Sequence, residues 1–315
     1  MSQSDSKFEE FRAGISPTVS VINDLASAVA ATAERHHRVP SEQSRAMREI
    51  HAQARTYGRR TSWDEPITDT HSFGGVILIA AIDYAHTFAS SLAADRTPVY
   101  GHLVVARSLL ESAVIASWLN EPDVEPDERV RRGLCEQIYN AWELVRLGIE
   151  EDANERVTRW MAVAEAFEWD VKKNNGKPAV GNTSWPSIPM GVDELVGTHR
   201  GRLGRAQWSY LSAVSHGTWY GLRQAVASEP VETAFGAPLA DFGTKLTDVW
   251  SQAICATRAL RGAAHARFTL MGWIDAEWRE ACRLSETHEN SLLAALQKHW
   301  ATLREGGSNE PAAAL

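Results

Sequence analysis

Apolar residues recur every three or four positions along almost the whole chain, and no stretch keeps the strict apolar–polar alternation of a half-buried strand. Helix starts agree with this pattern, because Ser16-Pro17 combines a capping residue with a proline suited to the first helical position. Pro126 opens a long helical region that reaches about Val171, with a break near Asp152. The sequence therefore predicts an all-α fold, a multi-helix bundle.

Three stretches interrupt the helical pattern, at residues 58–70, 172–204 and 228–238. The second is rich in Lys, Asn, Gly and Pro, and we expect it to form a long loop insertion, either a functional lid or a mobile segment. Helical periodicity resumes after it, so a single all-helical domain over residues 1–305 is expected. The tail from 306 to 315 is predicted to be disordered.

Composition limits the class of protein. The chain has 315 residues, 12 of them tryptophan, and a formal net charge of −8. The charge argues against a general polyanion binder, and the tryptophans favour a large packed interior or an aromatic-lined pocket. Cys135, Cys255 and Cys282 are far apart and show neither metal-ligand spacing nor a disulfide framework. With a polar, acidic N-terminus that is no signal peptide, these features predict a cytoplasmic protein.

The most apolar helix, expected from Phe73 to Ala94, has the length of a membrane span and contains no Lys or Arg. Its uninterrupted apolar run is confined to Val76 through Ile82. Asp83, near its centre, would cost about 3 kcal/mol in a bilayer. We therefore expect a buried core helix and no membrane partner.

Ionisable and hydroxyl side chains stand inside three otherwise apolar helical segments. The pairs are Asp83 with His86, Arg107 with Glu111, and Ser212 with His216. Members of each pair are three or four residues apart, so each pair shares one helix face with apolar neighbours. Since burying a charge costs several kcal/mol unless it is paired, the pattern predicts one shared polar site.

This site suggests an enzyme or binder of a small polar or anionic molecule. Arg107 would hold an anionic group, His86 or His216 would move protons, and Asp83 and Glu111 would orient them. Three further residues on the same faces are expected to contact the ligand: Ser212, Trp118 and Trp219. A purely structural alternative stays open, in which Arg107–Glu111 is an intrahelical pair, Asp83 neutralises Arg107, and His216 is a core histidine.

A metal site is a further hypothesis. Glu34 with His37 and Asp83 with His86 both follow the carboxylate-x-x-His spacing of di-iron helical bundles, and such a centre would make the protein an oxidase. Glu111 and Glu143 could supply the two further carboxylates. Their order along the chain differs from the usual alternation, so we expect no metal and no cofactor, with a di-iron or manganese centre as the alternative.

Nucleic acid is another candidate partner, through the basic loop 199–205 and through Lys172-Lys173 at the start of the same insertion. The alternative is a solvated charged loop. Gly201-Arg-Leu-Gly204 lacks the Gly-Lys-Ser/Thr ending of a phosphate-binding loop and the strand that precedes one. A helical interaction module without chemistry, including a homo-oligomer, is the remaining possibility.

The Arg107-x-x-x-Glu111 helix, followed by Tyr210-x-Ser212-x-x-x-His216-Gly217, resembles a pattern of bacterial all-helical proteins of unassigned function. Those proteins are similar to HEPN-type helical domains. The resemblance covers residues 70–225 and implies an RNA-directed protein, such as a toxin or a defence component.

Some HEPN-type domains are ribonucleases with an Arg-x(4–6)-His motif. That spacing occurs here at Arg45/His51, Arg96/His102 and Arg258/His265. The nearest arginine upstream of His216 is Arg205, which is too distant for the motif.

Overall fold

The computed structural model describes residues 3–57, 61–94, 100–148, 152–197, 203–224, 230–232, 238–240 and 246–305. Within these ranges helices dominate, which confirms the all-α, bundle-like expectation. The helices are α1 (Gln3–Arg35), α2 (Arg45–Thr56), α3 (Pro66–Ala93), α4 (Gly101–Leu119), α5 (Pro126–Leu147), α6 (Ala153–Ala166), α7 (Ile188–Val196), α8 (Leu203–Ser215), α9 (Trp219–Gln224), α10 (Leu246–Met271) and α11 (Ala276–Glu305). The predicted tail, 306–315, lies outside the described residues.

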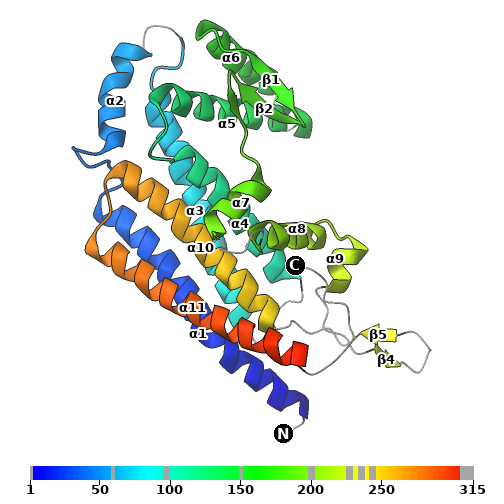
Figure 1. Cartoon of the computed structure of the whole chain (residues 1–315). Helices are drawn as coiled ribbons and strands as arrows, with labels where there is room; N and C mark the ends of the chain where they lie inside the picture. Colours follow the sequence, from blue (N-terminus) through cyan, green and yellow to red (C-terminus); the bar gives the residue numbers. More distant parts are fainter. Residues whose placement is uncertain are drawn as a thin grey trace.

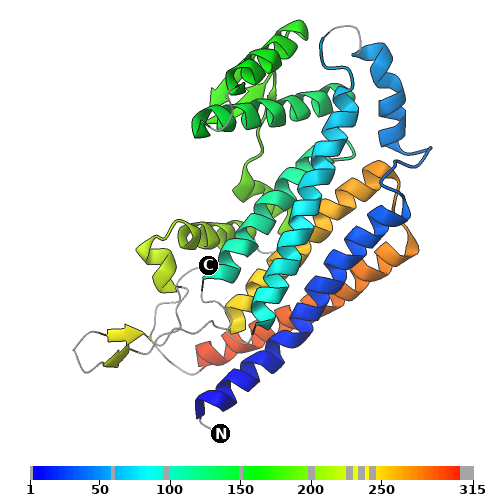
Figure 2. The ribbon, with the colours of Figure 1, turned by 180° about the vertical axis from the view of Figure 1, so that it is seen from behind.

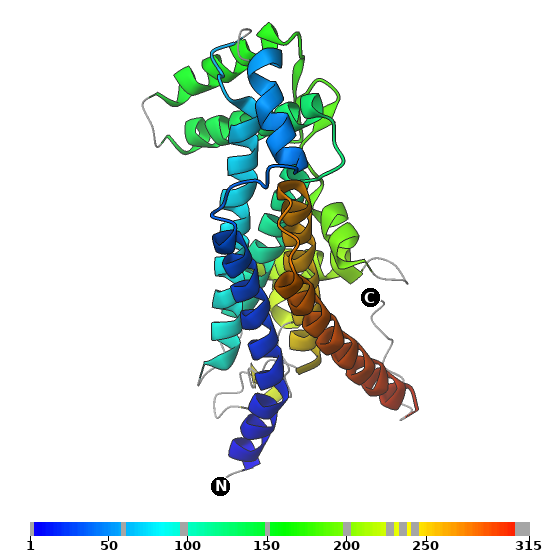
Figure 3. The same cartoon turned by 90° about the vertical axis from the view of Figure 1, so that its left-hand side faces the viewer.

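The body of the molecule is a bundle of five long helices. α3 packs along α4 and α1, while α10 packs against α4 and α1 from the other side, and α11 lies along α1 (Figures 1 and 2). Viewed from the side, these helices give the molecule an elongated outline (Figure 3). α7 and α8 pack on α4 and α10 and enlarge the same core.

A second, smaller core lies at the end of the bundle where α5 and α6 pack together (Figure 1). Trp63 packs edge-to-face on Trp160 there, with ring centroids 5.3 Å apart. Ile67, in the first turn of α3, belongs to this core, whereas Leu78 and Phe88 of the same helix belong to the bundle core. α3 therefore runs through both cores.

The segment expected to be a long loop, 172–204, is more ordered than its composition suggested. It contains three antiparallel strands, β1 (Val171–Asn174), β2 (Lys177–Val180) and β3 (Thr183–Ser184), followed by α7. Asn175 and Gly176 connect β1 to β2, and both have positive φ, as a two-residue hairpin requires. Val180 is fully buried against α5, so apolar packing fixes this sheet. Residues 198–202, most of the predicted basic loop, lie outside the described part.

Several helix boundaries follow the expected signals. The break near Asp152 is confirmed by the separation of α5 from α6. α11 begins after Asp275, whose Oδ1 accepts a 2.7 Å hydrogen bond from the Trp278 amide. α1, by contrast, starts at Gln3 and carries Pro17 inside it. From the predicted 228–238 interruption, the structure describes β4 (Pro230–Glu232) and the first residue of β5 (Pro238–Ala240), which pairs with it.

α3 and α4 are long and apolar enough to cross a membrane, by length and composition alone. Core helices of other proteins share this property. In α3 only 33% of the most apolar window is buried, and Val76 and Ile79 are exposed. The expectation of a core helix thus holds for one face of α3, while the other carries an uncovered apolar stripe.

Candidate functional site

Arg107 and Glu111 form the ion pair that their spacing predicts. On α4, Nε of Arg107 donates a 2.9 Å hydrogen bond to Oε1 of Glu111. The indole N–H of Trp208, on α8, donates to the same oxygen over 3.3 Å, and the Arg107 guanidinium lies 5.9 Å from the centre of that ring. Arg107 therefore already has a carboxylate and an aromatic partner, which reduces its capacity to hold an external anion.

His216 joins this cluster from the end of α8. Its Nε2 lies 3.5 Å from NH1 of Arg107, and the side chain is exposed. Ser212 lies one turn earlier and is half-buried, and its carbonyl accepts the His216 amide hydrogen bond. The structure thus brings together Arg107, Glu111 and His216 in a solvent-facing arrangement, with Ser212 one turn away on α8.

Asp83 and His86 belong elsewhere. Nδ1 of His86 lies 2.9 Å from Oδ1 of Asn23 on α1, so the histidine pairs across the α1–α3 contact. Asp83 is exposed on α3 and forms no ion pair within the described residues. The structure therefore splits the predicted single site, because Asp83 and His86 face α1 and Arg107 and Glu111 face α8.

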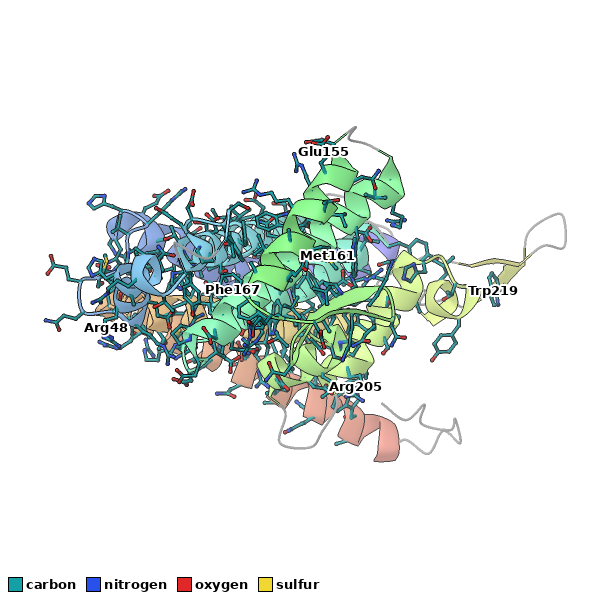
Figure 4. All side chains as sticks on the ribbon, turned by 90° about the horizontal axis from the view of Figure 1, so that it is seen from above. Arg48, Glu155, Met161, Phe167, Arg205 and Trp219 are labelled. Atoms are coloured by element: carbon teal, nitrogen blue, oxygen red, sulfur yellow. The ribbon has the colours of Figure 1, made fainter. Side chains whose placement is uncertain are left out.

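The two predicted tryptophans are also separated. Trp118 lies 5.8 Å from Trp185 and beneath the Arg132 guanidinium, and it lines a cleft of about 720 Å³ between α4, α7 and α10. His265, from one of the Arg-x(4–6)-His spacings, lines the same cleft. Trp219 is 78% exposed on α9 and lies at the outer edge of the molecule (Figure 4).

A cluster of deeply buried charged residues lies between the two cores. Arg129, at the start of α5, is completely buried and donates a 2.6 Å hydrogen bond from Nε to Oε2 of Glu49 on α2. Its other nitrogens donate to the carbonyls of Leu119 and Glu121, which ties the α4–α5 turn to the pair. Nε2 of His71, on α3, lies 3.4 Å from the same Glu49 oxygen. This cluster joins three helices and the turn that leads into α5.

Arg267, on α10, lies beside this cluster without a carboxylate of its own. It is 8% exposed, and its NH1 donates to the carbonyl of His71 and, over 2.8 Å, to Oδ1 of Asn120. Within the described part of the chain, no Asp or Glu oxygen lies within 4.0 Å of it, and Nε and NH2 meet no hydrogen-bond acceptor. The guanidinium lies 5.6 Å from the centre of the Trp273 ring.

The pKa values distinguish the paired Glu49 cluster from Arg267. Burial alone raises the pKa of Glu49, but contact with His71 and the charge of Arg129 outweigh it and lower that pKa to about 2. Burial lowers the pKa of His71 to about 4, so its ring is neutral at neutral pH. Burial, with repulsion from Arg129, lowers the pKa of Arg267 to about 9. Arg267 thus remains a cation at neutral pH, and no carboxylate of the described ranges lies close enough to offset its charge.

Arg267 opens onto a cleft of about 360 Å³ between α1, α3 and the end of α10, a volume within the range of small-molecule sites. Most of its lining is apolar: Val29, Ala30, Ala33, Val76, Leu78, Ile79, Ile82, Phe268 and Trp273. Gly75 also lines it, and a Cβ there would lie 3.0 Å from NH2 of Arg267. The missing side chain at Gly75 therefore leaves NH2 uncovered on the cleft side. Besides Arg267, the polar residues of the lining are Arg38, Ser72 and Asp83.

Sequence reasoning missed Arg267, although the signal it used was available. Arg267 stands among Ala263, Ala264, Phe268 and Leu270, on a helix face as apolar as those of α3 and α4. Applied to α10, the same argument about charges on apolar stripes would have selected it.

The carboxylate-x-x-His pairs do not assemble a metal centre in the described residues, which contain no group of three or more His, Cys, Asp or Glu placed to hold a metal ion. Glu143 instead pairs with Arg146 over 2.6 Å on the surface of α5.

Two arginines thus stand out: Arg107, which has its carboxylate, and Arg267, which faces a mostly apolar cleft and has no carboxylate partner among the described residues. No family model, no curated protein and no solved structure matches this chain.

Proposed function

We propose that the protein binds a small anionic molecule with an apolar body in the cleft between α1 and α3, and that Arg267 holds the anionic group. One observation carries the proposal: a buried guanidinium, without a carboxylate partner in the described structure, borders a cleft that is otherwise mostly apolar. The sequence led us to expect Arg107 as the residue that holds the anion. In this proposal Arg267 takes that role.

The energetic argument rests on the cost of burying an unpaired ion. Taking a guanidinium out of water costs several kcal/mol, and two neutral acceptors on NH1 return only part of it. An anion at Nε and NH2 would supply the missing charge in surroundings of low polarity, where such a contact is strongest. A carboxylate matches the planar donor fork of arginine and is the anion we favour.

The apolar walls of the cleft favour a ligand whose remaining part is apolar. Val76 and Ile79 are 66% and 45% exposed and border the opening, while Phe268 and Leu78 form its buried side. An apolar ligand body would cover this stripe and gain about 25 cal/mol for each Å² of apolar surface removed from water. The ligand therefore needs an anionic group for Arg267 and an apolar body for the cleft walls. A carboxylate on an aliphatic or aromatic frame has both.

The test uses decanoate as the probe, titrated calorimetrically into the full-length protein, with decanol as its uncharged counterpart. Arg267→Met keeps the length and apolar stem of the side chain and removes the charge. Decanoate affinity should fall at least about 30-fold, the equivalent of about 2 kcal/mol for losing one partner of a buried charge pair. Decanol affinity should not change.

Arg107→Met is the matched control, because it removes a guanidinium that already has Glu111. This variant should bind decanoate as the unmodified protein does. Equal binding by Arg267→Met and the unmodified protein, or equal loss in both variants, would overturn the proposal. So would a decanol affinity as high as that of decanoate.

A further inference from the structure

The cleft has two chemically different ends, and we infer that its ligand carries a second polar group, an amine, at the end opposite its carboxylate. Asp83 would receive that amine. This inference rests on the proposed binding of an anion at Arg267 and adds the class of molecule: an apolar chain or frame with a carboxylate at one end and an ammonium group at the other.

The position of each end follows from the register of α3. Gly75 lies against NH2 of Arg267, and Asp83 is eight residues further along the same helix. At the α-helical rise, eight residues correspond to about 12 Å. Ser72, Val76, Ile79 and Asp83 follow one another at helical spacing, and all four line the cleft. A ligand lying along this stripe therefore meets the cation first and the carboxylate last.

Arg38, the other charged residue of the cleft lining, adds positive charge at the end opposite Asp83. Arg38 follows α1, and the carbonyl of its neighbour Val39 accepts a 2.8 Å hydrogen bond from Nε1 of Trp273. The guanidinium of Arg267 lies 5.6 Å from the centre of the same Trp273 ring. Arg38 therefore lies at the Arg267 end. Its nearest carboxylate in the described structure is Glu34, at 4.0 Å on an exposed surface, a contact of small energy. One end is thus cationic and the other acidic.

Asp83 is free to accept a ligand. The side chain is exposed, and within the described residues it has no ion-pair or hydrogen-bond partner, whereas its backbone carbonyl accepts a bond from Thr87. The residues between Arg267 and Asp83 on the cleft wall are apolar, so no side chain there could satisfy a polar group in the middle of the ligand. This arrangement fits a charge at each end of an apolar spacer.

The experiment compares decanoate with 10-aminodecanoate, binding each to the unmodified protein and to Asp83→Asn by calorimetry at neutral pH and low salt. We take the ratio of the two affinities in each protein, because the ratio cancels changes that affect both ligands. Asp83→Asn should shift the ratio about threefold against the amine, as for an exposed ion pair, and added salt should shrink the effect. Asp64→Asn, which removes an exposed carboxylate outside the cleft, should leave the ratio unchanged.

Chain length gives a second readout. 6-Aminohexanoate is too short to reach from Arg267 to Asp83, so Asp83→Asn should not alter its affinity. The inference is overturned if Asp83→Asn leaves the ratio unchanged, or if it weakens the short and the long amino acid equally. Decanoate binding that depends on Arg267 would in that case still support the proposed function, whereas failure of decanoate to bind would remove both.

Discussion

Oδ1 of Asn120 accepts a 2.8 Å hydrogen bond from NH1 of Arg267, and in the described residues it is the one side-chain oxygen that this guanidinium meets. The orientation of the amide is fixed, because its Nδ2 donates a 2.7 Å hydrogen bond to the Ala116 carbonyl within α4. Gly74 provides the space, since a Cβ there would lie 2.5 Å from Nδ2 of Asn120. A neutral amide therefore stands where a counter-ion would be expected.

Asn120→Asp would place a carboxylate at that position with almost no change of shape. We expect decanoate affinity to fall at least about tenfold, because an internal anion would already neutralise Arg267. Unfolding in urea should show stability unchanged or raised by about 1 kcal/mol, since the new ion pair offsets the lost bond to Ala116. Asn154→Asp, at the surface, is the control. An Asn120→Asp protein with undiminished affinity would contradict the role given to Arg267.

Gly75→Ala tests the opening of the cleft. The added methyl group would lie 3.0 Å from NH2 of Arg267 and would partly cover the atom that faces the ligand. Alanine is favoured over glycine in a helix by about 1 kcal/mol, so the stability should stay equal or rise. Decanoate affinity should fall several-fold in the same titration. Ser90→Ala on the exposed surface of α3 controls for helix propensity, and binding equal to that of the control would count against the cleft.

Glu49→Gln should destabilise the protein by about 3–5 kcal/mol, because it leaves the fully buried Arg129 without its carboxylate. Glu143→Gln, which breaks the exposed pair with Arg146, should cost less than about 1 kcal/mol. Urea denaturation at neutral pH measures both. Similar costs for the two variants would mean that the buried pair contributes no more than a surface contact.

Acid should destabilise the protein through His71. Its pKa is about 4 in the folded state and 6.5 in the reference state, so the unfolded chain takes up a proton first. Stability present above pH 6.5 is therefore lost as the pH falls toward 4, by about 2–3 kcal/mol from this group. The low pKa of Glu49 adds a further loss between 4.5 and 2.

His71→Gln removes the titrating ring, so the unfolding free energy of this variant should depend less on pH between 6.5 and 4. Its absolute stability does not enter the comparison, because the slope against pH is the quantity measured. A slope equal to that of the unmodified protein would show that other groups carry the acid sensitivity.

The sequence supports the helical fold strongly because amphipathic periodicity is a local property. Helical spacing correctly placed Arg107 beside Glu111, and the expected break near Asp152 is found between α5 and α6. The hairpin in the 172–204 segment had a local signal as well, in Asn175-Gly176, but the composition of the surrounding loop outweighed it.

The sequence could not show in the same way whether the three polar pairs form one shared site. Spacing shows which residues share a face, yet it does not show which neighbouring helix that face meets. Asp83 and His86 face α1, so they do not join Arg107 and His216. The approach of Arg267 to Gly75 joins residues almost two hundred positions apart, and only the packing of α10 against α3 brings them together.

α3 contributes Ile67 to the core beneath α5 and α6, and Leu78 and Phe88 to the bundle core. Loss of either core would leave part of one continuous helix without packing, and an unsupported helical segment of that length has little stability in water. The two cores should therefore melt together, in a single transition seen alike by tryptophan fluorescence and by circular dichroism. The cleft lies along that shared helix, so a bound ligand would raise the melting temperature of the entire molecule.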